Sequence, residues 1–209
     1  AVPPGTTDQM STKLTADPEA KAERRRKVLV GAGALTAIAV VGGLVTLAVI
    51  QNPPPQARED IEIAGLQTFE GLSANHVSTP VDYEQSPPVG GDHASAWLNC
   101  GVYTEPVPNE NAVHALEHGA AWVAYDSEAL SQEQVDALRT ALPAAYVVLA
   151  PYEGLDSPIV LSAWQAQVAV DSPEDERIEQ FVAEYWQSPD APEPGAACTG
   201  GLDAPGRIA

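Results

Sequence analysis

The segment from Val28 to Ile50 constrains the topology of this chain more than any other feature of its sequence. Its 23 residues include no charged side chain. As an α-helix it would be about 35 Å long, enough to cross a bilayer core of about 30 Å. A cleaved secretory signal would have a shorter apolar core and a small-residue cleavage site, whereas this segment runs into a proline-rich stretch at residues 51–55. We therefore predict an uncleaved transmembrane helix over residues 28–50.

Charge predicts the orientation of this helix. Four basic residues at positions 24–27 directly precede it, and positive residues stay on the cytoplasmic side. Residues 1–27 carry a net charge of +2, whereas residues 51–209 carry −21. So acidic a region would be repelled by nucleic acid. We expect a single-pass cell-membrane protein with a cytoplasmic N-terminus, an extracytoplasmic C-terminal domain and no nucleic-acid partner.

Composition divides the chain into five parts. Prolines and charges at residues 51–60 indicate a spacer, and the Pro/Gly-rich end of the chain indicates an irregular tail. The predicted parts are a disordered cytoplasmic tail (1–27), the transmembrane helix (28–50), the spacer (51–60), a folded extracytoplasmic domain (61–190) and the C-terminal tail (191–209).

Local patterns predict an α+β domain with a β-α-β-β-α kernel. Strands are expected at 61–63, 120–125, 146–149, 159–164 and 167–170, and helices at 110–118, 131–142 and from Pro173 onward. Asn109 is the expected N-cap of the first helix and Gly119 its C-terminal stop. Ser131 and Gln134 form a capping-box pattern. The strands that flank the second helix should be parallel.

Cys100 and Cys198 are the two cysteines of the chain, and both follow the apolar segment. An oxidising compartment favours a disulfide between them. The bond would close a loop of about 98 residues and add roughly 4 kcal/mol of stability in the chain-entropy model. The alternative is a thiolate metal site, which would leave both sulfurs exposed to oxidation.

All four histidines lie between positions 76 and 118, and two of them share the string HALEH at 114–118. Helical spacing places His114 and His118 on one face, where two imidazoles can chelate one ion. The alternative reading is a chance pair, or polar groups hydrogen-bonded to the backbone. We predict a metal site whose ligands are His114, His118, His93 and His76.

Acidic residues near the pair could complete or support this site. Glu110 and Glu117 are the local candidates, and Glu117 is predicted to lie in a second shell. The turn at residues 87–93 should place His93 beside Trp97. Met10, the single methionine, precedes the apolar segment, so a thioether copper(I) carrier is disfavoured. Copper(II) or zinc is the expected ion.

The string HALEH also matches the H-x-x-E-H motif of inverted zinc peptidases. In that interpretation Glu117 would activate water, and Glu179 or Glu184 would supply a distal ligand. Gly119 ends the helix directly after the motif, whereas those enzymes carry it in a long helix. The hydrolase is therefore a third hypothesis, behind a metal-binding domain and a non-catalytic interaction domain of an envelope complex. No complete catalytic constellation is present, so an enzymatic role stays undecided and a non-enzymatic one is favoured.

Several strings occur together in a specific order: His76-Val77, Pro87-Pro88 with Gly91 and His93, residues 97–103 (WLNCGVY), 106–108 (PVP) and 113–120 (VHALEHGA). Over roughly residues 60–190 the chain resembles a group of mainly actinobacterial, membrane-anchored proteins called domain of unknown function 3105. The resemblance implies an envelope protein with one N-terminal anchor, and it supplies no activity. It slightly favours copper as the bound ion. It places in the family's signature stretches His76, His93, Cys100, His114, Glu117 and His118.

Overall fold

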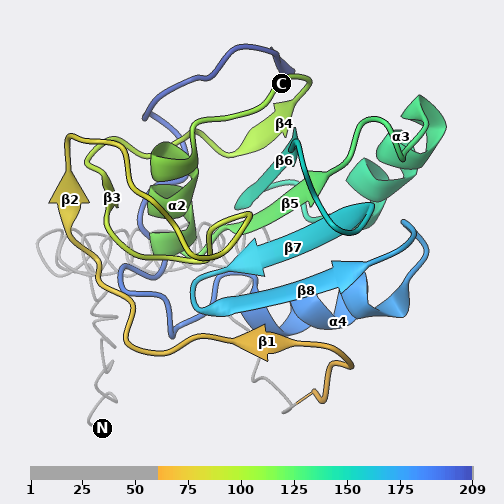
Figure 1. The fold of residues 1–209 in the computed structure, drawn as a ribbon, viewed down its shortest axis with the longest axis horizontal. Coiled ribbons are helices and arrows are strands. Elements are labelled where there is room, and N and C mark those ends of the chain that lie inside the picture. Colours follow the sequence, from red (N-terminus) through yellow and green to blue (C-terminus); the bar gives the residue numbers. More distant parts are fainter. Residues whose placement is uncertain (1–60, 209) are drawn as a thin grey trace, which may run out of the picture. The chain divides into compact units, whose positions relative to one another are not determined.

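A seven-stranded mixed sheet organises the part of the chain that the structure describes, residues 61–208 of a computed structural model (Figure 1). The strand order is β1-β8-β7-β5-β6-β4-β9. In chain order the sheet strands are β1 (Gln67–Thr68), β4 (Gly101–Tyr103), β5 (Ala121–Tyr125), β6 (Val147–Pro151), β7 (Ile159–Ala163), β8 (Ala166–Val170) and β9 (Arg207–Ile208). The helices are α2 (Asn109–Glu117), α3 (Gln132–Ala141) and α4 (Glu176–Tyr185). A separate two-stranded parallel sheet joins β2 (His76–Val77) to β3 (His93–Ala94).

The predicted transmembrane helix over residues 28–50 lies outside the described residues, as do the predicted N-terminal tail and spacer. Among residues 61–208, no helix is long and apolar enough to cross a membrane.

The sheet is buried on both faces. Successive side chains of its central strands point to opposite faces and enter two separate cores. On β5, Trp122 and Ala124 belong to the core on the α2 side, whereas Val123 and Tyr125 belong to the core on the opposite side. The second core also contains Leu138 of α3 and residues of α4. One helix with its neighbouring loops thus covers one face of the sheet, and two helices contribute to the core on the other.

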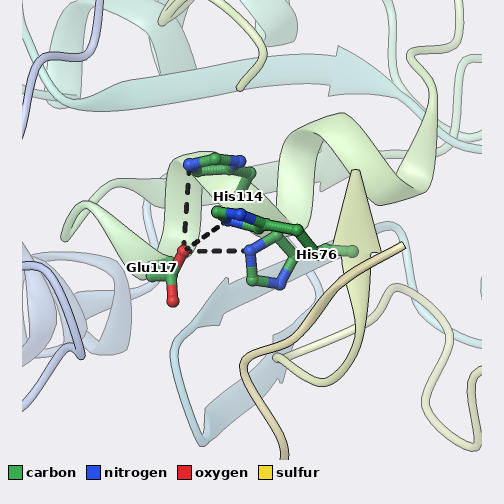
Figure 2. Close-up of side chains that lie close together, drawn as sticks. His76, His114 and Glu117 are labelled. Carbon is green, nitrogen blue, oxygen red and sulfur yellow. Dashed lines mark hydrogen bonds and ion pairs between the residues drawn. The ribbon is translucent and has the colours of Figure 1, made fainter. Parts of the chain in front are cut away.

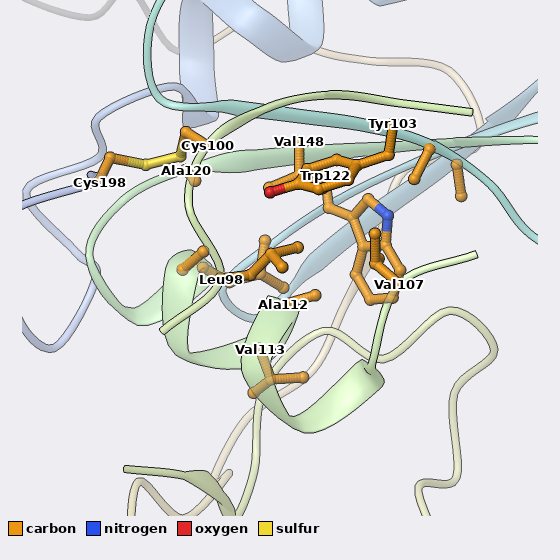
Figure 3. Packing of buried hydrophobic residues seen from close by; sticks show 14 of the residues in the cluster. Leu98, Cys100, Tyr103, Val107, Ala112, Val113, Ala120, Trp122, Val148 and Cys198 are labelled. Atoms are coloured by element: carbon orange, nitrogen blue, oxygen red, sulfur yellow. A yellow bond between two sulfur atoms is a disulfide. The ribbon is translucent and has the colours of Figure 1, made fainter. Parts of the chain in front are cut away.

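The disulfide cross-links the core on the α2 side of the sheet. Cys100 and Cys198 are bonded, as predicted, with their Cα atoms 5.3 Å apart. Figure 3 shows the bond beside the apolar residues packed between α2 and the sheet, among them Leu98 and Trp122. The residues after 190, predicted to be an irregular tail, are joined to the domain by this bond and by the pairing of β9 with β4.

The predicted α+β class and most kernel elements are confirmed. Strands β5 and β6 flank α3 and are parallel, and Ser131 and Gln134 make the predicted capping box. The two strands predicted at 159–164 and 167–170 are β7 and β8, which pair as an antiparallel hairpin before α4. Gly119 follows α2 with φ at +94°, and a Cβ there would lie 3.2 Å from the Gln187 Cα. Glycine is therefore needed at this stop.

Three local predictions are wrong. Residues 61–63 form no strand; Ile63 is buried in the core without joining a ladder, so its alternation reflects packing alone. Pro108, not Asn109, occupies the N-cap of α2, and no side chain caps this end. Helix α4 begins at Glu176 rather than near Pro173, because Asp175 accepts a hydrogen bond from the Arg177 backbone N–H and caps it there.

Candidate metal centre

Three imidazoles converge on one oxygen of the Glu117 carboxylate, and Figure 2 shows the rings of His76 and His114 directed toward it. We call His76, His93, His114 and Glu117 the inner group. The distances from Glu117 Oε2 to the Nε2 atoms of His93, His76 and His114 are 2.9, 3.7 and 3.8 Å. Three members are buried, whereas the His76 side chain is 46% exposed. The group is therefore a largely enclosed cluster of four donors that is open at one ligand.

Two different parts of the fold supply these side chains. Residues His114 and Glu117 lie one turn apart on α2, which orients them toward the same side. His76 and His93 are direct register partners in the β2–β3 pair. The β2–β3 pair packs near α2. The ring centroids of His76 and His93 lie 4.8 and 4.9 Å from that of His114. The site thus depends on a long-range pairing across the loop before α2.

Backbone carbonyls fix the tautomer of the buried histidines. The Nδ1 atoms of His93, His114 and His118 each lie 2.7 Å from a carbonyl oxygen, of Gly91, Ala94 and Ala197 respectively. A carbonyl oxygen can only accept, so each Nδ1 carries the hydrogen and donates it. In the neutral ring, Nε2 then keeps its lone pair and is available to a metal, as is usual for metal-ligating histidines.

A hydrogen or a metal ion must lie between His93 Nε2 and Glu117 Oε2. With Nδ1–H donated to Gly91, a neutral His93 presents the Nε2 lone pair to a carboxylate oxygen at 2.9 Å, and two lone pairs repel each other. Either a proton on one of the two atoms or a metal ion between them removes this conflict. A proton explains the 2.9 Å contact, but the separations of 3.7 and 3.8 Å to the other two rings exceed hydrogen-bond length.

The inner group fits a bound ion. Ligand atoms held tetrahedrally about 2.0–2.1 Å from one ion lie about 3.3 Å apart, and the three measured separations bracket that value. Burial lowers the pKa of His114, and the neighbouring His118 and His93 act in the same direction. His114 is therefore neutral near pH 7, which is the form that coordinates metals.

The chemistry of the donor atoms limits which ions the inner group could bind. Three imidazole nitrogens and one carboxylate oxygen suit zinc, copper(II), nickel or iron, and they lack the soft sulfur that favours copper(I). Both cysteines form the disulfide, so neither offers a thiolate ligand.

The fourth predicted ligand, His118, belongs to a second group, which we call the outer group: His114, His118 and Glu193. The Nε2 atom of His118 lies 3.5 Å from Glu193 Oε2. The Glu193 side chain is 54% exposed. Sequence reasoning missed Glu193, because it lies in an irregular Pro/Gly-rich stretch 75 positions beyond His118 and carries no local signal.

Other sequence-based candidates lie elsewhere or in other roles. Glu117 is among the residues whose atoms could bind the ion directly, and its second-shell role stays a prediction. Glu110 accepts a hydrogen bond from the Val81 N–H. Among residues 61–208, neither group contains Glu179 or Glu184, so the distal ligand of the hydrolase hypothesis finds no support. His93 contacts Trp164, and Trp97 instead lies against His114 and His118.

Comparison with known protein families assigns the chain to one of them. Residues 76–200 match the family described as protein of unknown function (DUF3105), and the chain belongs to that family. The matched region contains every residue of the inner and outer groups. Comparison with curated proteins and with solved structures gives no match.

Proposed function

We propose that this protein is a membrane-anchored, extracytoplasmic binder of a divalent transition metal, copper(II) or zinc, held by the inner group. The observation that carries the proposal is the convergence of three Nε2 atoms on one buried carboxylate oxygen. The contacts of Nδ1 of His93 and His114 with backbone carbonyls, which leave Nε2 as the atom directed at the carboxylate, support it.

Three features support the extracytoplasmic location. The Cys100–Cys198 disulfide suits an oxidising compartment. The uncharged segment 28–50, preceded by four basic residues, suits an N-terminal anchor with a cytoplasmic start. The net charge of −21 after that segment suits a water-exposed domain that attracts cations.

The test is elemental analysis of the full-length chain, purified in detergent without a histidine tag. His93→Asn and His114→Asn are the matched variants, because the asparagine amide can replace the Nδ1–H donor while removing the Nε2 ligand. Since the chain has four histidines and all belong to the two groups, stray imidazole binding is minimal. Near-stoichiometric copper or zinc that is lost in both variants supports the proposal. A metal-free wild type that also takes up no added copper or zinc overturns it.

A second function is an interaction domain of an envelope complex, in which the histidines only hold the fold together. The observation that favours it is the set of hydrogen bonds from Nδ1 of His93, His114 and His118 to backbone carbonyls. It predicts stoichiometric co-purification with a membrane assembly that is independent of added metal. Loss of that co-purification on removing metal would contradict it.

A further inference from the structure

His114 is the one residue shared by the inner and outer groups. Its Nδ1–H is donated to the Ala94 carbonyl at 2.7 Å, so Nε2 is its single free donor atom. A neutral imidazole nitrogen has one lone pair and binds one ion at a time. The two groups are therefore alternative positions for the same ion, rather than the two halves of a two-metal centre.

The two positions differ in donor number and in exposure. The inner group offers four donor atoms, three of them on buried residues, whereas the outer group offers three, one of them on the exposed Glu193. More donors and less water favour retention at the inner position. An exposed carboxylate favours exchange with ions or carriers in solution at the outer one.

The outer group is held in place by the segment that carries Glu193. The N–H groups of Glu193 and Gly195 donate to the carbonyls of Glu117 and His118, at 3.0 and 3.2 Å. These bonds satisfy carbonyls at the C-terminal end of α2 that have no partner within the helix. The Ala197 carbonyl orients the His118 ring, and the next residue forms the disulfide. Glu193 is thus positioned next to His118 by the fold.

We propose that the outer group is the loading and unloading position of the metal site. The ion first binds His118 and Glu193 and then gains His114. It moves inward when the bonds to His118 and Glu193 break and bonds to His93, Glu117 and His76 form, while the bond to His114 Nε2 persists. This inference rests on the proposed function. A direct route past the exposed His76 is the competing path.

Rapid-mixing fluorescence tests this path, with copper(II) glycinate added to the metal-free full-length chain. Copper(II) quenches nearby indoles. Trp97 contacts His114 and His118 at ring distances of 5.8 and 5.2 Å, and Trp164 contacts His93 at 6.1 Å. Quenching should occur in two phases. Glu193→Gln should slow loading and chelator-driven release by about the same factor, tenfold or more. His93→Asn should instead keep the fast phase and weaken final binding.

Glu128→Gln, an exposed carboxylate outside both groups, is the matched control and should behave as wild type. Glu193→Gln alters an exposed side chain, so its folding is not at risk; His118→Asn, which can keep the donor to Ala197, is the second variant. Copper binding with one phase, unaffected by either variant, overturns the loading position but leaves the proposed function intact. Two copper ions per chain would also overturn it. An absence of quenching and of bound copper, together with no uptake of added zinc, overturns both.

Discussion

Replacing Glu117 with glutamine should reduce the stability that a bound metal adds to this domain and leave the stability of the metal-free domain nearly unchanged. The carboxylate is buried and lies 2.9–3.8 Å from three imidazole nitrogens. In the metal-free protein, the glutamine amide can donate to His93 Nε2 and keep that contact, so the melting temperature should change little. With metal, the variant lacks the one anionic donor of the inner group.

The size of the effect follows from linkage. At an ion concentration about 100-fold above the dissociation constant, binding stabilises the folded state by about 2.7 kcal/mol. For a domain of about 150 residues this raises Tm by roughly 5–11 °C. Loss of a second-shell partner weakens metal binding about 10–100-fold, so loss of a ligand should weaken it at least 100-fold. The same ion concentration then stabilises Glu117→Gln by at most about 0.4 kcal/mol, which corresponds to a rise in Tm of at most roughly 1–2 °C.

Differential scanning calorimetry with and without copper(II) or zinc measures both values, and Glu128→Gln serves as the carboxylate control. If Glu117→Gln keeps the full metal-induced rise in Tm, Glu117 is not a ligand and the inner group is wrongly composed. If the wild type shows no rise at saturating metal, no ion prefers the folded state.

Three further predictions concern the fold around the site. Asp175→Asn should remove the ion pair with Arg177 at the start of α4, which lowers the pKa of Asp175. The resulting loss of about 0.5–1 kcal/mol at pH 7 should begin to shrink as pH falls below the ordinary value of 3.8 and should disappear once the carboxyl is protonated in the folded protein; urea unfolding at several pH values checks this. A loss that does not shrink between pH 7 and pH 2 would contradict it. Gly119→Ala should cost about 1–3 kcal/mol, because φ is +94° there; unchanged urea unfolding would refute the need for glycine. Serine at both positions of the Cys100–Cys198 pair should cost roughly 3–5 kcal/mol, since the bond closes a separation of 98 residues; a loss below about 1 kcal/mol in guanidinium unfolding would argue against this chain-entropy effect.

Short-range signals of the sequence determined much of the helical and strand content. The capping box at Ser131 and Gln134 and the stop at Gly119 act within one turn of chain. The spacing of His114 and His118 places both side chains on one face of the helix, and their ring centroids lie 4.6 Å apart. The same spacing, however, could not show that each of the two histidines faces a different carboxylate.

Only the tertiary structure decided the composition of the site. The pairing of His76 with His93 depends on the register of two short parallel strands, which no local pattern specifies. Glu193 reaches His118 because the disulfide and the hydrogen bonds to α2 bring a late, irregular segment back to the helix. The sequence thus supplied the histidine and carboxylate side chains that a metal site would use. Long-range packing decided which of them meet, because ligand contacts join segments whose separation along the chain carries no periodic signal.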